Sequence, residues 1–187
     1  MARTLSKAAH QSIINAFVTL MTRQPIEKIT TDAIARAAGS SKGTLYTHWA
    51  DKEALLLEVV GQMLATQPVA DSGDFRKDTT QVLSDIFVRD SRKMFGRIWP
   101  NIFSYSSMHP KFCRAVTKAL FDHAPNCSLI SIIRAAIKAG QLRGDLDLTL
   151  AVDLLAGPLM HHRLLHGSVP AAMPEKVVAT VWPHLAA

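Results

Sequence analysis

The sequence predicts an all-α fold in two parts, a short N-terminal helical module over residues 1–52 and a larger helical domain over residues 53–187. Apolar residues recur at helical spacing in almost every segment. No stretch combines sustained alternation with β-branched residues and hairpin turns, so strands are not expected. Hydrophobic residues make up 48% of the 187 residues, which is enough to bury a core and excludes a disordered or low-complexity chain.

In the N-terminal part, two short helices are expected between two longer helices along the sequence. The first longer helix is expected over about residues 5–23, and Pro25, which lacks a backbone N–H, ends it. Its core face is formed by Ala9, Ile13, Phe17 and Leu20. Asp51 is the expected N-cap of the second longer helix, which continues through residues 52–65 and carries Leu55, Val59 and Met63 on one side.

The two short helices are expected to be joined by a tight turn. Residues 32–38 follow a capping hydroxyl at position 30 or 31 and end at Gly39, a residue type that tolerates a positive φ at a helix end. Ser41 is the expected N-cap of the next helix, which runs through Trp49. Two helices joined by a short turn that contains glycine describe a helix-turn-helix, and its second helix is suited to the DNA major groove.

The charge and the residue types of this segment favour nucleic acid as a partner. The formal net charge is +6 and the sequence pI is about 9.6. Residues 1–55 hold seven Lys or Arg against four Asp or Glu, so the positive charge is densest here. Lys42 can donate to guanine edges, Thr44 can bond a base or a phosphate, and Gly43 removes a side chain where the backbone approaches the duplex.

Residues 30–56, TTDAIARAAGSSKGTLYTHWADKEALL, resemble the N-terminal signature of TetR-family regulators, in which IA-x-x-AG, S-x-x-TLY-x-H-aromatic and KE-x-L follow in this order. The resemblance covers roughly residues 5–60. It implies that Leu45 and Trp49 belong to the core. It also implies DNA contacts from an exposed set of residues, namely Thr31, Ser41, Lys42, Gly43, Thr44, Tyr46, Thr47, His48 and Lys52. Asp32 suits the start of its helix but would repel a nearby phosphate.

A hydrolase motif overlaps the same segment. Residues 39–43 satisfy G-x-S-x-G, the nucleophile elbow of α/β-hydrolases, but that elbow requires a strand before the serine, and here a helical pattern precedes it. We find no nucleophile, metal or acid-base set in credible context. The sequence therefore predicts a protein that is not an enzyme and that needs no cofactor.

Residues 67–74, QPVADSGD, predict a break after the N-terminal helices because they combine Pro, Gly, Ser and Asp. Helices are expected beyond it at about residues 75–91, 92–107, 111–139 with a break or bend at Pro125, 147–166 and 173–186.

The middle helices are rich in aromatic side chains. A regulator needs a cavity whose occupation shifts the protein between two arrangements, and a helical domain lined with such residues can hold an apolar ligand. The predicted ligand-binding residues are Phe87, Trp99, Phe103, Tyr105, Phe112, Phe121 and His161. The alternative is that these side chains only fill the core.

The segment that begins at Gly140 and includes LLAGPLMHHRLL is similar to the penultimate region of TetR-family regulators, which the family uses for dimerisation. Its leucines, with Val177, Val181 and Leu185 of the last helix, offer more apolar surface than one helix needs. The predicted dimer interface consists of Leu150, Leu154, Leu155, Leu159, His162, Val177 and Val181. The alternative is that these helices only cover the core of their own subunit.

His162 and His166 are four residues apart, so they share a helix face as metal-binding pairs do. No catalytic Glu lies between them, and a polar contact to a ligand or to a partner subunit is the favoured interpretation, so no metal is predicted. Cys113 and Cys127 are too few for a disulfide framework and lack the spacing of zinc sites, which indicates reduced, buried and structural residues.

Together these features predict a homodimeric repressor that leaves a near-palindromic, double-stranded DNA operator when a small apolar effector binds. The family resemblance implies that the effector would act by changing the separation of the two recognition helices. The chain shows no export signal and no apolar stretch long enough for a membrane span, so a cytoplasmic location is expected. The alternative function is a helical ligand-binding protein that does not read DNA sequence.

Overall fold

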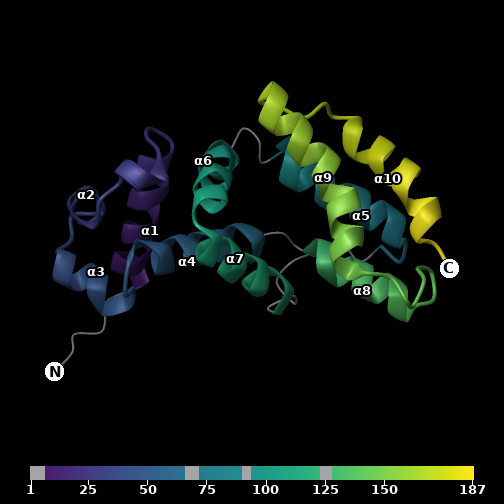
Figure 1. Ribbon diagram of the computed structural model, residues 1–187, viewed down its shortest axis with the longest axis horizontal. Coiled ribbons are helices and arrows are strands. Elements are labelled where there is room, and N and C mark those ends of the chain that lie inside the picture. Colours follow the sequence, from purple (N-terminus) through teal and green to yellow (C-terminus); the bar gives the residue numbers. More distant parts are fainter. Residues whose placement is uncertain (1–6, 66–71, 90–93, 123–127) are drawn as a thin grey trace. The chain divides into compact units, whose positions relative to one another are not determined.

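The computed structural model describes residues 7–65, 72–89, 94–122 and 128–187 (Figure 1). These residues form α-helices, a short 3₁₀ turn, a π-helical turn and one isolated β-bridge between Leu142 and Ala186. The predicted all-α fold is confirmed. The chain packs as two compact units, one made of residues 1–63 and 97–117 and the other of residues 64–96 and 118–187.

The first unit combines the N-terminal helices with a segment from the middle of the chain. Its elements are α1 (Lys7–Met21), the 3₁₀ turn η1 (Ile26–Lys28), α2 (Thr31–Ala37), α3 (Lys42–His48), most of α4 (Lys52–Ala65), and parts of α6 (Met94–Met108) and α7 (Pro110–Asp122). Its fully buried side chains include Phe17, Leu45, Leu55 and Ile98. Their burial fixes the short helices α2 and α3, which could not hold their shape alone.

The second unit is built from α5 (Phe75–Ser84), the π-helical turn η2 (Asp85–Arg89), α8 (Ser128–Lys138), α9 (Leu148–His166) and α10 (Met173–Leu185). Helix α5 packs against both α8 and α10, and α9 also contacts α8 and α10. Asp147 caps α9 by accepting hydrogen bonds from the backbone N–H groups of Thr149 and Leu150. The buried core of this unit includes Leu83, Ile133 and Val178.

The expected helix over residues 111–139 is divided into α7 and α8, and Pro125, at which a break or bend was predicted, lies outside the described residues. Cys127 lies outside them as well. The prediction that Cys113 is buried is wrong: α7 buries the adjacent Phe112 and leaves Cys113 as a free, exposed thiol. In the described part of the chain no helix is long and apolar enough to cross a membrane. These units are defined by packing and do not test the boundary between a DNA-binding and a ligand-binding domain predicted after residue 52, which stays a prediction.

Candidate nucleic-acid interface

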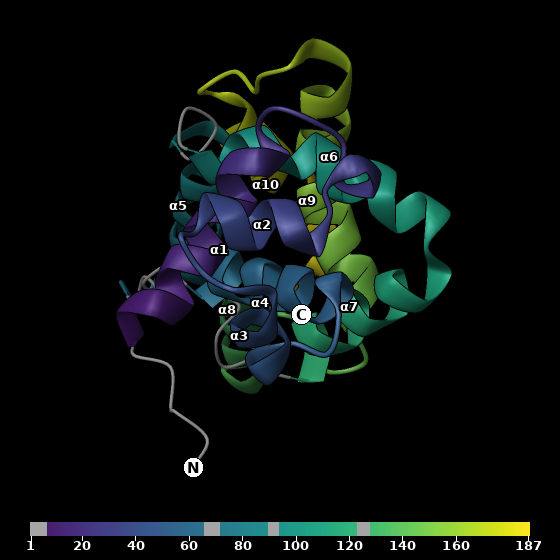
Figure 2. The same cartoon turned by 90° about the vertical axis from the view of Figure 1, so that its left-hand side faces the viewer.

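Helices α2 and α3 form the two arms of the helix-turn-helix, and both face the viewer in Figure 2. Each begins at a hydroxyl N-cap. The Thr30 side chain accepts a hydrogen bond from the backbone N–H of Ala33 at 3.2 Å, and Ser41 accepts one from Thr44 at 3.0 Å. Gly39 has a φ of 64°, a left-handed conformation that an L side chain adopts only with strain. The turn is therefore fixed by local chemistry, as the sequence predicts.

One side of α3 is held by the core of its unit. Leu45 is fully buried and Trp49, the C-cap, is 3% exposed, which confirms both as core residues. The Trp49 indole N–H donates to Glu58 Oε2 at 2.8 Å, and His10 Nε2 lies 2.6 Å from the other oxygen of the same carboxylate. These contacts connect α1, α3 and α4 and set the orientation of α3.

The opposite side of α3 forms an exposed polar face. Its exposed residues are Ser41, Lys42, Gly43, Tyr46, Thr47 and His48, while Thr31 and Thr44 are half-buried beside them. The Tyr46 hydroxyl is 3.3 Å from Thr31 Oγ1, so the start of α2 and the middle of α3 share one surface. Tyr46 keeps 46% of its area exposed, so its ring and hydroxyl are accessible on this surface.

Lys42 is paired with Asp32 in this structure. Its Nζ lies 3.1 Å from Asp32 Oδ2, and both side chains are about half exposed. The hydrogen bond to Asp32, followed by the attraction between the two charges, raises the pKa of Lys42. Lys42 thus neutralises the Asp32 carboxylate, which would otherwise repel a nearby phosphate. To contact DNA, Lys42 would have to exchange Asp32 for a group of the DNA.

Lys52 is engaged within the protein. Its Nζ donates to the carbonyl oxygens of Ile26 at 2.7 Å and Ile29 at 3.1 Å, and it lies 5.7 Å from the centre of the Tyr105 ring. Partial burial lowers its pKa. Lys52 therefore holds the backbone of η1, and we leave it out of the DNA-contact set proposed below.

Asn101 and Tyr105 lie on α6, outside the N-terminal module in sequence, but both bond to it in the structure. These contacts are not predicted from the sequence. The Asn101 Nδ2 donates to the carbonyls of Met21 at 3.0 Å and Gln24 at 2.8 Å, and its Oδ1 accepts from the N–H of Ile26 at 3.0 Å. One side chain from α6 thus satisfies three backbone groups between α1 and η1. No local signal could show this, because the partners are 75 to 80 residues apart.

The Tyr105 hydroxyl makes a second connection, donating to Glu53 Oε1 at 2.9 Å. Burial, together with Glu53, raises the Tyr105 pKa far above its ordinary value, so the hydroxyl stays protonated and remains a donor. Helix α6 is therefore bonded to the end of α1 and to the beginning of α4.

Two family models match most of the chain. The family described as bacterial regulatory proteins of the tetR family matches residues 13–59, and the tetracyclin repressor-like C-terminal domain matches residues 69–181, which is more than half of the chain. The chain belongs to the TetR family. It is a helix-turn-helix transcriptional regulator, and regulators of this family are typically repressors with a ligand-binding C-terminal domain.

Individual relatives and solved structures agree with this assignment. An uncharacterised HTH-type transcriptional regulator of Bacillus subtilis, YdeS, is 24% identical, with 88% of this chain and 83% of that protein covered. The HTH-type regulator EthR of Mycolicibacterium smegmatis is 29% identical, with 87% of this chain and 77% of EthR covered. The fold is similar to that of FadR from Bacillus halodurans, with a TM-score of 0.70, 15% identity and 96% of both chains covered. It is also similar to a TetR-family protein from Shewanella sp. PV-4, with a TM-score of 0.66, 22% identity, and 96% and 98% of the two chains covered.

In this TetR-family regulator the residues predicted to bind an effector are divided between the two units. Tyr105 and Phe112 are buried in the first unit with their rings in edge contact at 5.4 Å, and Trp99 and Phe103 are half-buried on α6 with ring centres 5.8 Å apart. Phe87 is buried in the core of the second unit, where His161 is exposed on α9. The Phe121 side chain lies outside the described residues.

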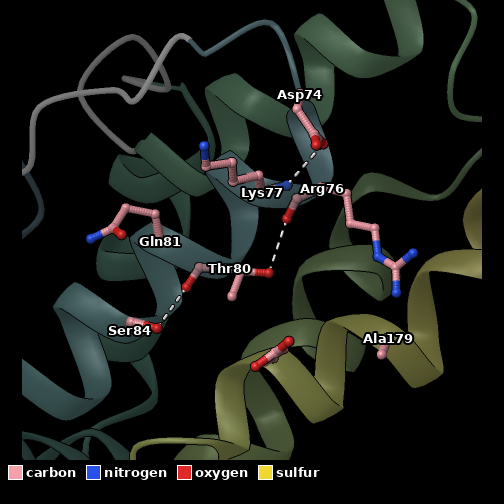
Figure 3. Close-up of a pocket in the computed structure, with 8 residues that line it drawn as sticks. Asp74, Arg76, Lys77, Thr80, Gln81, Ser84 and Ala179 are labelled. Carbon is pink, nitrogen blue, oxygen red and sulfur yellow. Dashed lines mark hydrogen bonds between the residues drawn. The ribbon is translucent and has the colours of Figure 1, made fainter.

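The second unit has an open, polar pocket of about 390 Å³ between α5 and α10 (Figure 3). It is lined by Asp74, Arg76, Lys77, Thr80, Gln81, Ser84, Glu175 and Ala179. The hydroxyls of Thr80 and Ser84 already donate to backbone carbonyls of their own helix. Because most of its lining side chains are polar, this pocket does not suit an apolar ligand. None of the residues predicted to bind the effector lines it.

The residues predicted to form the TetR-family dimer interface fall into two groups. Leu150 and Leu154 are 55% and 41% exposed, and Val181 is half-buried. Leu155, Leu159 and Val177 lie in the core of their own unit, with little or no surface left for a partner. His162 is half-buried and bonded to Ser168 within the chain. The interface proposed below therefore rests on the exposed leucines.

Proposed function

We propose that this TetR-family regulator is a homodimeric repressor that binds a near-palindromic operator through α3 and leaves it when a small apolar effector binds. The observation that carries the proposal is the exposed polar face of α3 on a helix whose other face is fixed by buried Leu45 and Trp49. A recognition helix needs both properties, because base contacts are short-range and require a rigid support.

The proposed DNA contacts follow from the exposed groups. Lys42 would exchange Asp32 for a guanine edge or a phosphate, and Tyr46 and His48 would donate to phosphates. Gly43 allows close approach of the backbone, since its missing side chain leaves the start of α3 open. The full set is Thr31, Ser41, Lys42, Gly43, Thr44, Tyr46, Thr47 and His48.

The proposed dimer surface is a line of exposed leucines along α9. Leu150, Leu154, Leu164 and Leu165 are between 41% and 66% exposed, and helical spacing puts them on one side of the helix. Leucines exposed in this number along one helix face favour burial against a second copy. A twofold dimer would present two α3 helices to half-sites one turn of DNA apart, about 34–36 Å, or a multiple of it.

The proposed route from effector to DNA runs through α6. Trp99 and Phe103 are four residues apart and share one face of α6, whereas Asn101 lies on the opposite face and holds the end of α1. An apolar molecule packed on Trp99 and Phe103 would favour a shifted position of α6. The three hydrogen bonds of Asn101 would transmit that shift to the backbone before α2. The effector would weaken DNA binding by its preference for the shifted state.

The first experiment is footprinting of the full-length protein on the DNA that flanks its own gene, at fixed salt. Lys42→Ala removes the proposed base contact, and Lys138→Ala, at an exposed lysine on α8, is the control with the same loss of charge. We expect a protected near-palindrome that Lys138→Ala retains and Lys42→Ala loses. Selection from a random-sequence library tests whether the protein prefers any sequence. Binding that depends on salt but shows no preferred sequence would overturn operator recognition.

A further inference from the structure

The last turns of α9 lie beside the loop that leads to α10 (Figure 1). They carry two imidazole rings that lie together. The rings of His162 and His166 have centroids 4.4 Å apart and are tilted by 44°. Helical spacing puts them in line with the core residues Leu155 and Leu159, on the side of α9 away from the exposed leucines. His166 is exposed and His162 half-buried, so an ion in solution can reach both.

A backbone carbonyl selects the tautomer of one of these rings. His162 Nδ1 lies 2.9 Å from the carbonyl oxygen of Ser168. A carbonyl only accepts hydrogen bonds, so Nδ1 carries a proton, and in the neutral ring Nε2 then keeps its lone pair. Metal-binding histidines have this arrangement, with one nitrogen held by a carbonyl or carboxylate and the other available to the ion. The loop is itself held in place, because Gly167 has a φ of 73° and its N–H donates to Arg163 O at 2.8 Å.

We propose that His162 and His166 bind a divalent transition-metal ion, of the class that imidazole prefers, such as Ni²⁺ or Zn²⁺. A pair of histidines four apart on a helix can hold one ion between them. Across the described residues no group of three or more metal-ligating side chains gathers, so water completes the coordination of the ion.

The local charge is compatible with a cation at this position. The last carbonyls of a helix carry partial negative charge, and both rings lie in the last two turns of α9. The nearest cation in sequence, Arg163, is only 4% exposed, and its Nη1 points to the carbonyl oxygen of Phe87 at 3.4 Å. The bound ion joins two turns of α9 next to the loop and stabilises this end of the second unit by mass action.

The test is isothermal titration of tag-free, full-length protein with NiCl₂, in a Cys113→Ser background because Cys113 is a free, exposed thiol. His166→Gln is the main variant, since it removes a ligand and leaves the bond between His162 and Ser168 intact. His161→Gln is the matched control, because His161 is an exposed neighbour whose partner four residues on is Leu165. Circular dichroism without metal checks that each variant is folded.

We expect saturable Ni²⁺ binding that His166→Gln and His162→Gln each weaken by about tenfold or more, the scale on which even the outer partners of metal ligands act. His161→Gln should bind as the parent protein does. Hydrogen exchange in residues 160–169 should slow when Ni²⁺ is added. Unchanged binding in a folded His166→Gln variant, or an equal loss in His161→Gln, would overturn the proposal.

Discussion

Replacing Asn101 should destabilise the first unit more than its place in the middle of the chain suggests. Its carboxamide is the common partner of two carbonyls and one N–H in the segment between α1 and η1. In Asn101→Ala these three backbone groups lose their partner at once. They belong to the connection that leads into the helix-turn-helix, so the loss should affect operator binding as well as stability.

The size of the effect follows from the three hydrogen bonds, which are 2.8 to 3.0 Å long. Each contributes about 0.5–1.5 kcal/mol net, and a backbone group left without a partner costs more when water cannot reach it. Asn101 is half-buried, so water replaces part of what is lost. We expect Asn101→Ala to lower the free energy of unfolding by about 2 kcal/mol. Asn101→Asp should cost about 1 kcal/mol more, because it sets a carboxylate against two carbonyl oxygens.

Urea unfolding of the full-length variants, followed by circular dichroism, measures this difference. Asn15→Ala is the control, since the exposed Asn15 side chain accepts one bond from Gln11, and its effect should stay within about 0.5 kcal/mol. If Asn101→Ala costs no more than Asn15→Ala, the carboxamide does not hold the segment. If Asn101→Asp is as stable as the parent, the two hydrogen bonds donated by Asn101 Nδ2 do not stabilise this segment.

Three further predictions concern the turn, the dimer and acid stability. Gly39→Ala should lower the free energy of unfolding by about 1–2 kcal/mol in urea, from backbone strain alone, because a Cβ there meets no atom within 4 Å. Leu154→Asp should raise the dimer dissociation constant in sedimentation equilibrium by roughly 30-fold or more, whereas Thr180→Asp, at an exposed position of α10, should leave it unchanged. Burial favours a higher pKa for Glu58, but hydrogen bonds from His10 and Trp49 outweigh it and hold the pKa below its ordinary value. Glu58 therefore adds stability above its ordinary pKa that is lost as the pH falls through its lowered pKa, and a scan of melting temperature below pH 5 should show a smaller acid loss in Glu58→Gln.

Each of these three has an outcome that contradicts its reasoning. A Gly39→Ala variant as stable as the parent would show that the turn does not need the positive φ. A Leu154→Asp protein that stays dimeric at the same concentration would remove the leucine face of α9 from the interface. An acid loss that is equal in Glu58→Gln and in the parent would place the responsible carboxylate elsewhere.

The sequence by itself determines the helices and the helix-turn-helix. The signals are local: a hydroxyl at residue 30 and at Ser41, a glycine at residue 39, and apolar residues at helical spacing. Each acts within one or two turns of a helix, so it can be read without knowing the fold. The same reasoning places Leu45 in the core and Lys42 on the surface.

Only the tertiary structure decides which partner a long or buried side chain meets. Lys52 has the residue type of a DNA contact, but its ammonium binds the carbonyls of Ile26 and Ile29, in η1 and at its C-cap, instead. Leu154 and Leu155 are neighbours with the same chemistry, yet one is 41% exposed and the other is fully buried. Asn101 carries no sequence signal, because its three partners are 75 to 80 residues away. Such contacts depend on how helices distant in the sequence pack together, and the local pattern of residues does not contain that information.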